Sequence, residues 1–291
     1  MSHFTVIVIG GFIEQQLAPY DESISVSPYF TEESGWYVEK GKELAKERDY
    51  DPDVLENLVK ALNEEYDDES PFCIVDGKFG RMTTYNPNSK WDWYTIGGRW
   101  RGFFPLKPGI EYNPLNLGES GIFEQLNESD YAKDRRVDIA QKCQIDFESA
   151  RNSAEQDGRE LFKKWRIIFQ EHGKPKSWES IRESNENIHF ARELYGNQPA
   201  IIKARDELRF FMSCPVELIG FDEEAYIQKC RNSALVPYAI VKNGEWYAQG
   251  EMGWWGMSND DMTNEEWSAK IQDLYQSLSD ETLLTLVDCH I

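Results

Sequence analysis

Cysteine pairs of the C-x-x-C type are missing from this sequence, whose five cysteines are widely scattered. An odd, scattered set argues against a disulfide framework and against a zinc site built on cysteine. The H-E-x-x-H and G-x-S-x-G signatures are missing too, as is any paired-carboxylate metal spacing. We therefore expect free thiols, no metal, no cofactor and no catalytic residue that a motif identifies.

Long hydrophobic runs are also missing. The longest, residues 4–13, is too short to span a bilayer, follows no basic segment and precedes no small-residue cleavage site. We expect neither membrane insertion nor a signal peptide. The protein should then act in the compartment where it is made.

Positive charge is scarce, since the formal net charge is -21 and the pI is about 4.6. Such a charge repels nucleic-acid backbones and anionic membranes at long range. Phosphate binding scales with the number of neutralised charges, so we expect no direct nucleic-acid binding. A basic protein surface is the partner that this charge favours.

One segment departs from this pattern, residues 86–104, NPNSKWDWYTIGGRWRGFF, which concentrates aromatic rings and cations. Residues 81–117 carry five basic and only two acidic side chains. Three interpretations stay open: aromatic packing, a stacking and phosphate-binding platform in which Arg99 holds the phosphate, and a protein interface, where Trp, Tyr and Arg dominate binding.

A second glycine-tryptophan segment, residues 250–257 (GEMGWWGM), can supply the other wall of such a platform. The candidate ligand- or partner-binding residues are Trp91, Asp92, Trp93, Arg99, Trp100, Arg101, Glu251, Trp254 and Trp255.

Hydrophobic patterning predicts strands near both ends of the chain and helices in the middle. Residues 4–9 (FTVIVI) read as a buried strand, 72–75 and 81–85 as a hairpin, and 283–287 as the closing strand. Asn243-Gly244 predicts a type I′ hairpin turn. Helices are expected from Asp51-Pro52 onwards, over 131–171 and the segments that follow to about 230, and after the Thr263–Glu266 capping box. Residues 19–40 read as irregular.

These elements predict an α+β fold, with a ferredoxin-like antiparallel sheet formed by both terminal regions and a large helical insertion. The sheet domain would comprise residues 1–117 and 236–291, and the insertion residues 118–235. In that topology the first and last strands lie side by side, which would bring His3 near Asp288 and His290. This cluster is the one acid-base candidate among the four histidines.

Three stretches resemble a group of poorly characterised proteins of tailed phages: HFTVIVIG…EQQLAPYDE, NPNSKWDWYTIGGRW and GEMGWW…LLTLVDCHI. The resemblance leaves residues 118–235 largely unmatched. It implies an accessory protein of the host-cell cytoplasm during infection, of a kind that often disarms host defence by binding.

The leading hypothesis is a non-enzymatic phage protein that inhibits a host process, an antiviral defence complex or its nucleotide signal. One alternative is an enzyme acting on a nucleotide-like molecule, with Asp92, Glu251 or His290 in acid-base roles. Another is a structural or scaffolding protein, for which self-assembly into a homo-oligomer is expected.

Overall fold

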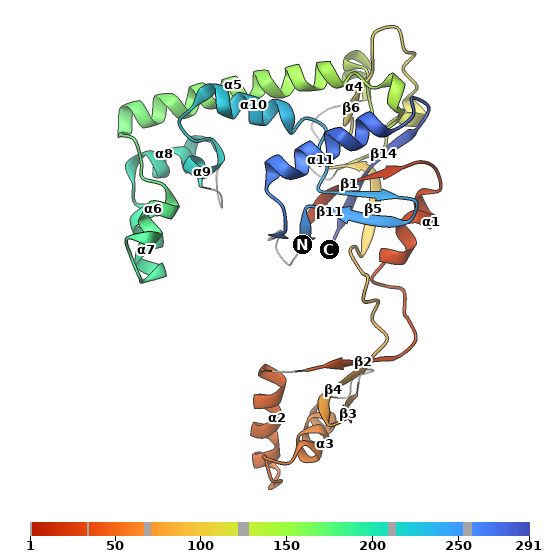
Figure 1. Ribbon diagram of the computed structural model, residues 1–291, viewed down its shortest axis with the longest axis vertical. Helices are drawn as coiled ribbons and strands as arrows, with labels where there is room; N and C mark the ends of the chain where they lie inside the picture. The colour runs from red at the N-terminus through yellow and green to blue at the C-terminus, as the bar shows by residue number, and fades with distance from the viewer. Residues whose placement is uncertain (1, 34, 67–70, 122–127, 209–213, 253–257) are drawn as a thin grey trace. The chain divides into compact units, whose positions relative to one another are not determined.

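The computed structural model describes residues 2–33, 35–66, 71–121, 128–208, 214–252 and 258–291. It is a mixed α/β protein with several sheets, in agreement with the predicted α+β class (Figure 1). The chain forms two compact units, which are described separately. Unit 1 comprises Met1–Ile13 and Thr95–Cys289, and unit 2 comprises Glu14–Tyr94 and His290–Ile291.

The main sheet of unit 1 brings together segments from along the whole chain. Its order is β11 (Glu245–Ala248), β10 (Ala239–Lys242), β1 (His3–Ile9), β14 (Leu283–His290), β5 (Trp93–Gly98) and β7 (Glu119–Ser120), and β9 (Ile139–Gln141) pairs with β14. Since β1 and β14 are buried along most of their lengths, their near-continuous apolar sequences are explained by burial on both faces.

The ferredoxin-like arrangement is not confirmed. β1 pairs in parallel with β10, the first strand of the β10–β11 hairpin. A ferredoxin-like sheet would instead place the second hairpin strand beside β1, in antiparallel orientation. The hairpin itself is as predicted, because Asn243 and Gly244 both have the positive φ of a type I′ turn, 55° and 77°.

The predicted boundaries at 117/118 and 235/236 do not coincide with the limits of the two units. Strands within 118–235 contribute to unit 1, because β7 pairs with β5 and β9 pairs with β14. A further short ladder joins β6 (Phe104–Pro105) to β8 (Arg136–Val137), and β12 (Gly250–Met252) pairs with β13 (Ser258–Asp260).

Helices pack on this sheet and extend from it. They are α4 (Glu128–Asp134), α5 (Phe147–His172), α6 (Trp178–Glu183), α7 (Ile188–Gly196), α8 (Pro199–Leu208), α9 (Pro215–Leu218), α10 (Glu223–Asn232) and α11 (Asn264–Ser277), with 3-10 turns at Pro114–Asn116 and Lys142–Gln144. The single helix predicted over 131–171 is wrong: β8, β9 and a 3-10 turn interrupt it. α5 begins only after Asp146, whose side chain accepts from the Ser149 N–H.

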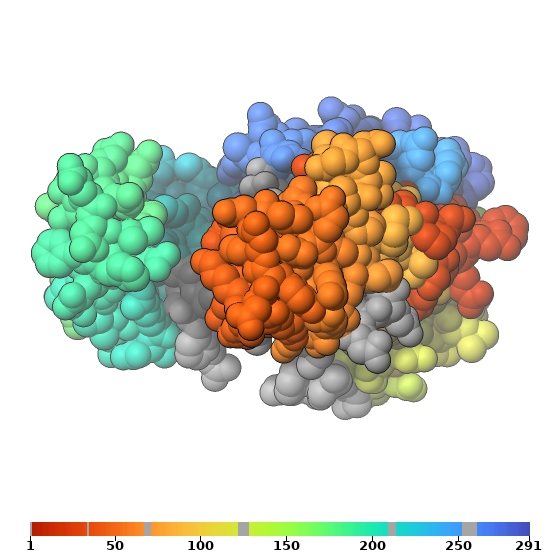
Figure 2. All heavy atoms as spheres, turned by 90° about the horizontal axis from the view of Figure 1, so that it is seen from below, coloured from red at the N-terminus to blue at the C-terminus, as the bar shows by residue number. Residues whose placement is uncertain are grey.

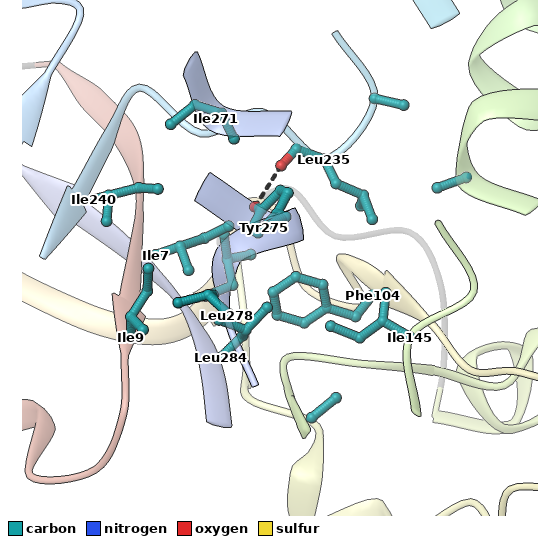
Figure 3. Close-up of a cluster of buried hydrophobic side chains, with 14 of the residues drawn as sticks. Ile7, Ile9, Phe104, Ile145, Leu235, Ile240, Ile271, Tyr275, Leu278 and Leu284 are labelled. Carbon is teal, nitrogen blue, oxygen red and sulfur yellow. Dashed lines mark hydrogen bonds between the residues drawn. The ribbon is translucent and has the colours of Figure 1, made fainter. Parts of the chain in front are cut away.

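The central core lies between the sheet and α11. Ile7, Ile240 and Leu284 come from the strands and pack with Phe104 and Ile271 (Figure 3). Tyr275 of α11 donates from its hydroxyl to the carbonyl of Leu235 at 2.8 Å within the same cluster. The predicted Thr263–Glu266 capping box begins α11, which fixes where this helix meets the sheet.

The helices after residue 160 have a second core of their own. Its largest fully buried side chains are Phe162, Trp165 and Ile201. This cluster explains the change from strand-like to helical patterning that the sequence shows in its middle. Figure 2 shows the surface of this region in green to teal.

Unit 2 is a small α/β unit. It contains α1 (Ile13–Leu17, which begins in unit 1), a 3-10 turn at Ala18–Tyr20, α2 (Trp36–Glu47), α3 (Leu55–Glu65) and a sheet of order β2 (Tyr29–Glu32), β4 (Lys78–Thr83), β3 (Phe72–Val75). α2 and α3 pack on each other and on Phe72 and Phe79. Two predictions fail here. β2 and the beginning of α2, residues 36–40, lie in the stretch read as irregular. α3 starts at Leu55 rather than Pro52, because Asp51 instead accepts from the Asp53 N–H at 3.0 Å.

Across the described ranges, none of the helices combines the length and the apolar character needed to cross a membrane.

Candidate functional site

The later part of the 86–104 segment, residues 97–103, comprises the last two residues of β5 and the turn that follows, and is called loop 97–103 below. A buried carboxylate of the last strand holds it in place. Asp288 of β14 accepts from the backbone N–H of Arg99 at 2.9 Å through Oδ2. Its other oxygen, Oδ1, lies 2.9 Å from His3 Nδ1. Because Asp288 is buried, these partners replace the water that its carboxylate loses on folding.

A second buried carboxylate, Asp138, holds the other end of the same loop. Its Oδ1 accepts from the N–H groups of Gly102 at 2.8 Å and Phe103 at 3.1 Å, and its Oδ2 accepts from Gly118 at 2.9 Å. Burial raises the pKa of the Asp138 carboxyl, while the three backbone donors and the charge of Arg101 oppose that rise. Loop 97–103 is therefore fixed at both ends by side chains from elements distant in the sequence.

The Gly97-Gly98 pair makes this close approach possible. A β-carbon at Gly98 would lie 2.4 Å from Asp288 Oδ2, and one at Gly97 would lie 2.8 Å from Asp138 Oδ2. Both glycines also have positive φ, 82° and 57°. The pair is thus explained by two buried carboxylates and a left-handed backbone.

The two arginines of loop 97–103, Arg99 and Arg101, differ in their exposure to solvent. Arg99 is exposed, whereas the Arg101 side chain is only 8% exposed. Arg101 donates to Ser120 Oγ at 2.8 Å, lies 3.5 Å from the Glu128 carboxylate and stacks over the Tyr131 ring at 5.2 Å. Arg101 is consequently a fixed structural charge, and Arg99 is the cation of this loop available to solvent.

An open hollow of about 290 Å³ lies against the same loop. Trp100, Arg101 and Phe103 form its loop side, and Arg136 lies beside them. Helix α5 and residues Ala234–Leu235 complete the lining. Trp100 and Arg101, two of the predicted binding residues, therefore share a concave surface.

Three other predicted residues lie in unit 2. Trp91 is 6% exposed and donates from its indole N–H to the Leu17 carbonyl at 3.2 Å, so it packs in a core. Trp93 is 41% exposed and stacks on His290, with ring centroids 5.2 Å apart and planes at 17°. Asp92 Oδ1 lies 2.6 Å from His290 Nδ1.

The expected cluster of three residues forms only in part. His3 pairs with Asp288, as the strand pairing predicts, but the carboxylate partner of His290 is Asp92. Asp92 also donates from its N–H to the His290 carbonyl at 3.0 Å, which ties residues 92 and 290 together twice.

Of the second segment, Glu251 is exposed on β12, opposite Asn259 of β13. Trp254 and Trp255 lie outside the described residues. Within the described part of the chain, Glu251 makes no hydrogen bond or ion pair with loop 97–103.

Sequence reasoning missed Asp138. The available signal was a lone acid inside an apolar stretch, R-V-D-I-A, which matches L-V-D-C-H around Asp288. A buried carboxylate in such a strand requires several donors, and glycine-rich backbone is a source of them. Reading residues 131–171 as one helix concealed this signal.

No group of three or more His, Cys, Asp or Glu side chains among the described residues is placed to hold a metal ion. Comparison of the chain with protein-family models, with curated proteins and with solved structures gave no match. The function is therefore inferred from the sequence and the geometry of the chain itself.

Proposed function

We propose that this chain is a phage-encoded protein of the host cytoplasm that inhibits a host process by binding, without catalysis. Its target is an antiviral defence complex or the nucleotide signal of that complex. The phage context comes from the resemblance in three sequence stretches, and the binding role comes from loop 97–103.

The observation that carries the proposal is the fixed backbone around Arg99. Asp288 and Asp138 anchor the loop on either side of this exposed cation, so little conformational entropy remains to be lost on binding. Arg is among the residues that dominate interfaces, and the half-buried Trp100 lies next to it. A positive, preorganised loop on a chain of net charge -21 is a specific feature that a binding role explains.

Capture from infected cells tests the proposal. The tagged full chain is recovered during infection, and bound proteins and small molecules are identified together by mass spectrometry. The proposal expects a host protein or a nucleotide at a stoichiometric level. Recovery of the chain in self-assembled form alone would instead support a scaffolding role.

One observation favours an enzyme as the second candidate. The Asp92–His290 pair, 2.6 Å apart, fixes an imidazole as acid-base catalysis requires. Incubation with a nucleotide panel separates the two functions, because an enzyme releases product over many turnovers and a binding protein only retains its ligand. Turnover that is lost in Asp92→Asn would overturn the non-catalytic proposal.

A further inference from the structure

The hollow beside loop 97–103 has one helical and one aromatic wall. One wall is a stripe of α5 at i, i+3, i+4 and i+7 spacing: Ala150, Ser153, Ala154 and Asp157. The two alanines leave space between this helix and the loop. Trp100 and Phe103 supply aromatic surface on the opposite side.

Two charged side chains on the lining have unused hydrogen-bonding capacity. Arg136 donates from Nη1 to the Gly102 carbonyl at 3.1 Å and makes no ion pair with any residue in the described ranges. Asp157, on α5, is exposed and likewise makes neither an ion pair nor a hydrogen bond within the described part of the chain. The hollow therefore offers a ligand the guanidinium of Arg136 as a donor and the carboxylate of Asp157 as an acceptor.

The far wall of the hollow holds a strained residue. Leu235 has φ of 58°, a conformation that a bulky residue without a polar side chain rarely adopts. The Tyr275 hydroxyl holds its carbonyl at 2.8 Å, inside the core (Figure 3). Such outliers cluster at binding sites, where surrounding structure maintains them.

We infer that this hollow binds a guanine mononucleotide. At about 290 Å³ it lies near the lower limit of ligand pockets, roughly 300–1,000 Å³, so it takes a base while the phosphate stays at the rim. Trp100 stacks on the base. Arg136, with the charge of Arg101 behind it, binds the phosphate.

Asp157 provides the selection among bases. A carboxylate accepts two hydrogen bonds, and the guanine edge donates two, from N1–H and from the N2 amino group. Adenine has an unprotonated N1 at that edge, which would face the carboxylate lone pairs. The inference rests on the proposed function and specifies guanine as the base of the nucleotide that the protein binds.

Calorimetric titration of the full chain with GMP, AMP, XMP and guanosine tests this assignment. We expect GMP to bind at least tenfold more tightly than AMP, because AMP offers the Asp157 carboxylate an unprotonated N1 in place of two donors. Arg136→Gln should weaken GMP about tenfold and leave guanosine unchanged. Asp157→Asn should move the preference from GMP to XMP, because an amide donates to the C2 oxygen of xanthine.

Equal affinity for GMP and AMP, absence of GMP binding, or equal weakening of all nucleotides by Asp157→Asn would each overturn the assignment. Asp134→Asn, on exposed α4, is the matched control and should change nothing. The two proposals fail separately. If the chain captures a host protein in an Arg99-dependent way but does not bind GMP, only the GMP assignment is refuted. Nucleotide turnover would instead refute the proposed non-catalytic function.

Discussion

Gly98 and Asp288 approach so closely that a β-carbon on the glycine would lie 2.4 Å from the carboxylate oxygen Oδ2. The two residues are far apart in the sequence, and their contact fixes the conformation of loop 97–103. The aromatic and cationic 86–104 segment is thus organised around buried acids from other elements.

Gly98→Ala is expected to destabilise the protein by roughly 2–5 kcal/mol, the combined cost of a left-handed alanine and of overpacking against Asp288. Gly109→Ala is the matched control, since Gly109 also has positive φ, 85°, but nothing lies within 4 Å of its β-carbon position. It should cost only about 1–2 kcal/mol. Urea unfolding followed by circular dichroism gives both values, and equal losses would contradict the close approach.

The pKa of the Asp138 carboxyl should lie above the ordinary aspartate value of 3.8, because burial outweighs its backbone donors. Since the folded-state pKa is the higher one, the native state binds the extra proton. The contribution of Asp138 to stability is therefore largest below about 3.8 and falls as pH rises through the folded-state pKa. Carboxyl-carbon NMR, assigned with Asp138→Asn, measures the midpoint, and a midpoint below 3.8 would show that the backbone donors dominate.

Trp91→Phe and Trp93→Phe should differ, although the sequence places both in one candidate platform. The first removes a buried ring and leaves the Leu17 carbonyl without its indole donor, at a cost of about 1–3 kcal/mol. The second alters a ring that is 41% exposed and should cost less than about 1 kcal/mol. Thermal unfolding compares them, and a larger loss for Trp93→Phe would reverse the assignment of core and surface.

Tyr275→Phe should destabilise the protein by about 1–3 kcal/mol, because it leaves the buried Leu235 carbonyl unpaired. It should also loosen the strained wall of the hollow. Tyr247→Phe, at an exposed ring, serves as the control and should be close to neutral. Equal stability of the two variants would indicate that Leu235 holds its conformation without this hydrogen bond.

Local patterns predicted several elements correctly. Asn243-Gly244 identified the hairpin turn and Thr263–Glu266 identified the start of α11, because each signal depends on a few neighbouring residues. Strand β1 was predictable for the same reason, since its apolar run is short and ends in glycine.

The sheet order and the site geometry were not predictable in this way. Parallel pairing of β1 with β10 joins segments more than 200 residues apart, which hairpin signals cannot report. Asp138 lies in a stretch whose periodicity reads as helix, and its role depends on donors from Gly102, Phe103 and Gly118. Tertiary contacts of this kind override local propensity.

Binding through Arg99 and its neighbour Trp100 is tested most directly by quantitative capture. Tagged wild-type chain, Arg99→Ala and Arg99→Ala/Trp100→Ala are recovered from infected cells, with Lys133→Ala on exposed α4 as the control and thermal unfolding as the check on folding. The single variant leaves the core untouched, because Arg99 is exposed. We expect capture of the partner to fall at least tenfold in the single variant, to vanish in the double variant and to persist in the control. Undiminished capture by folded Arg99→Ala/Trp100→Ala would contradict a binding role for loop 97–103.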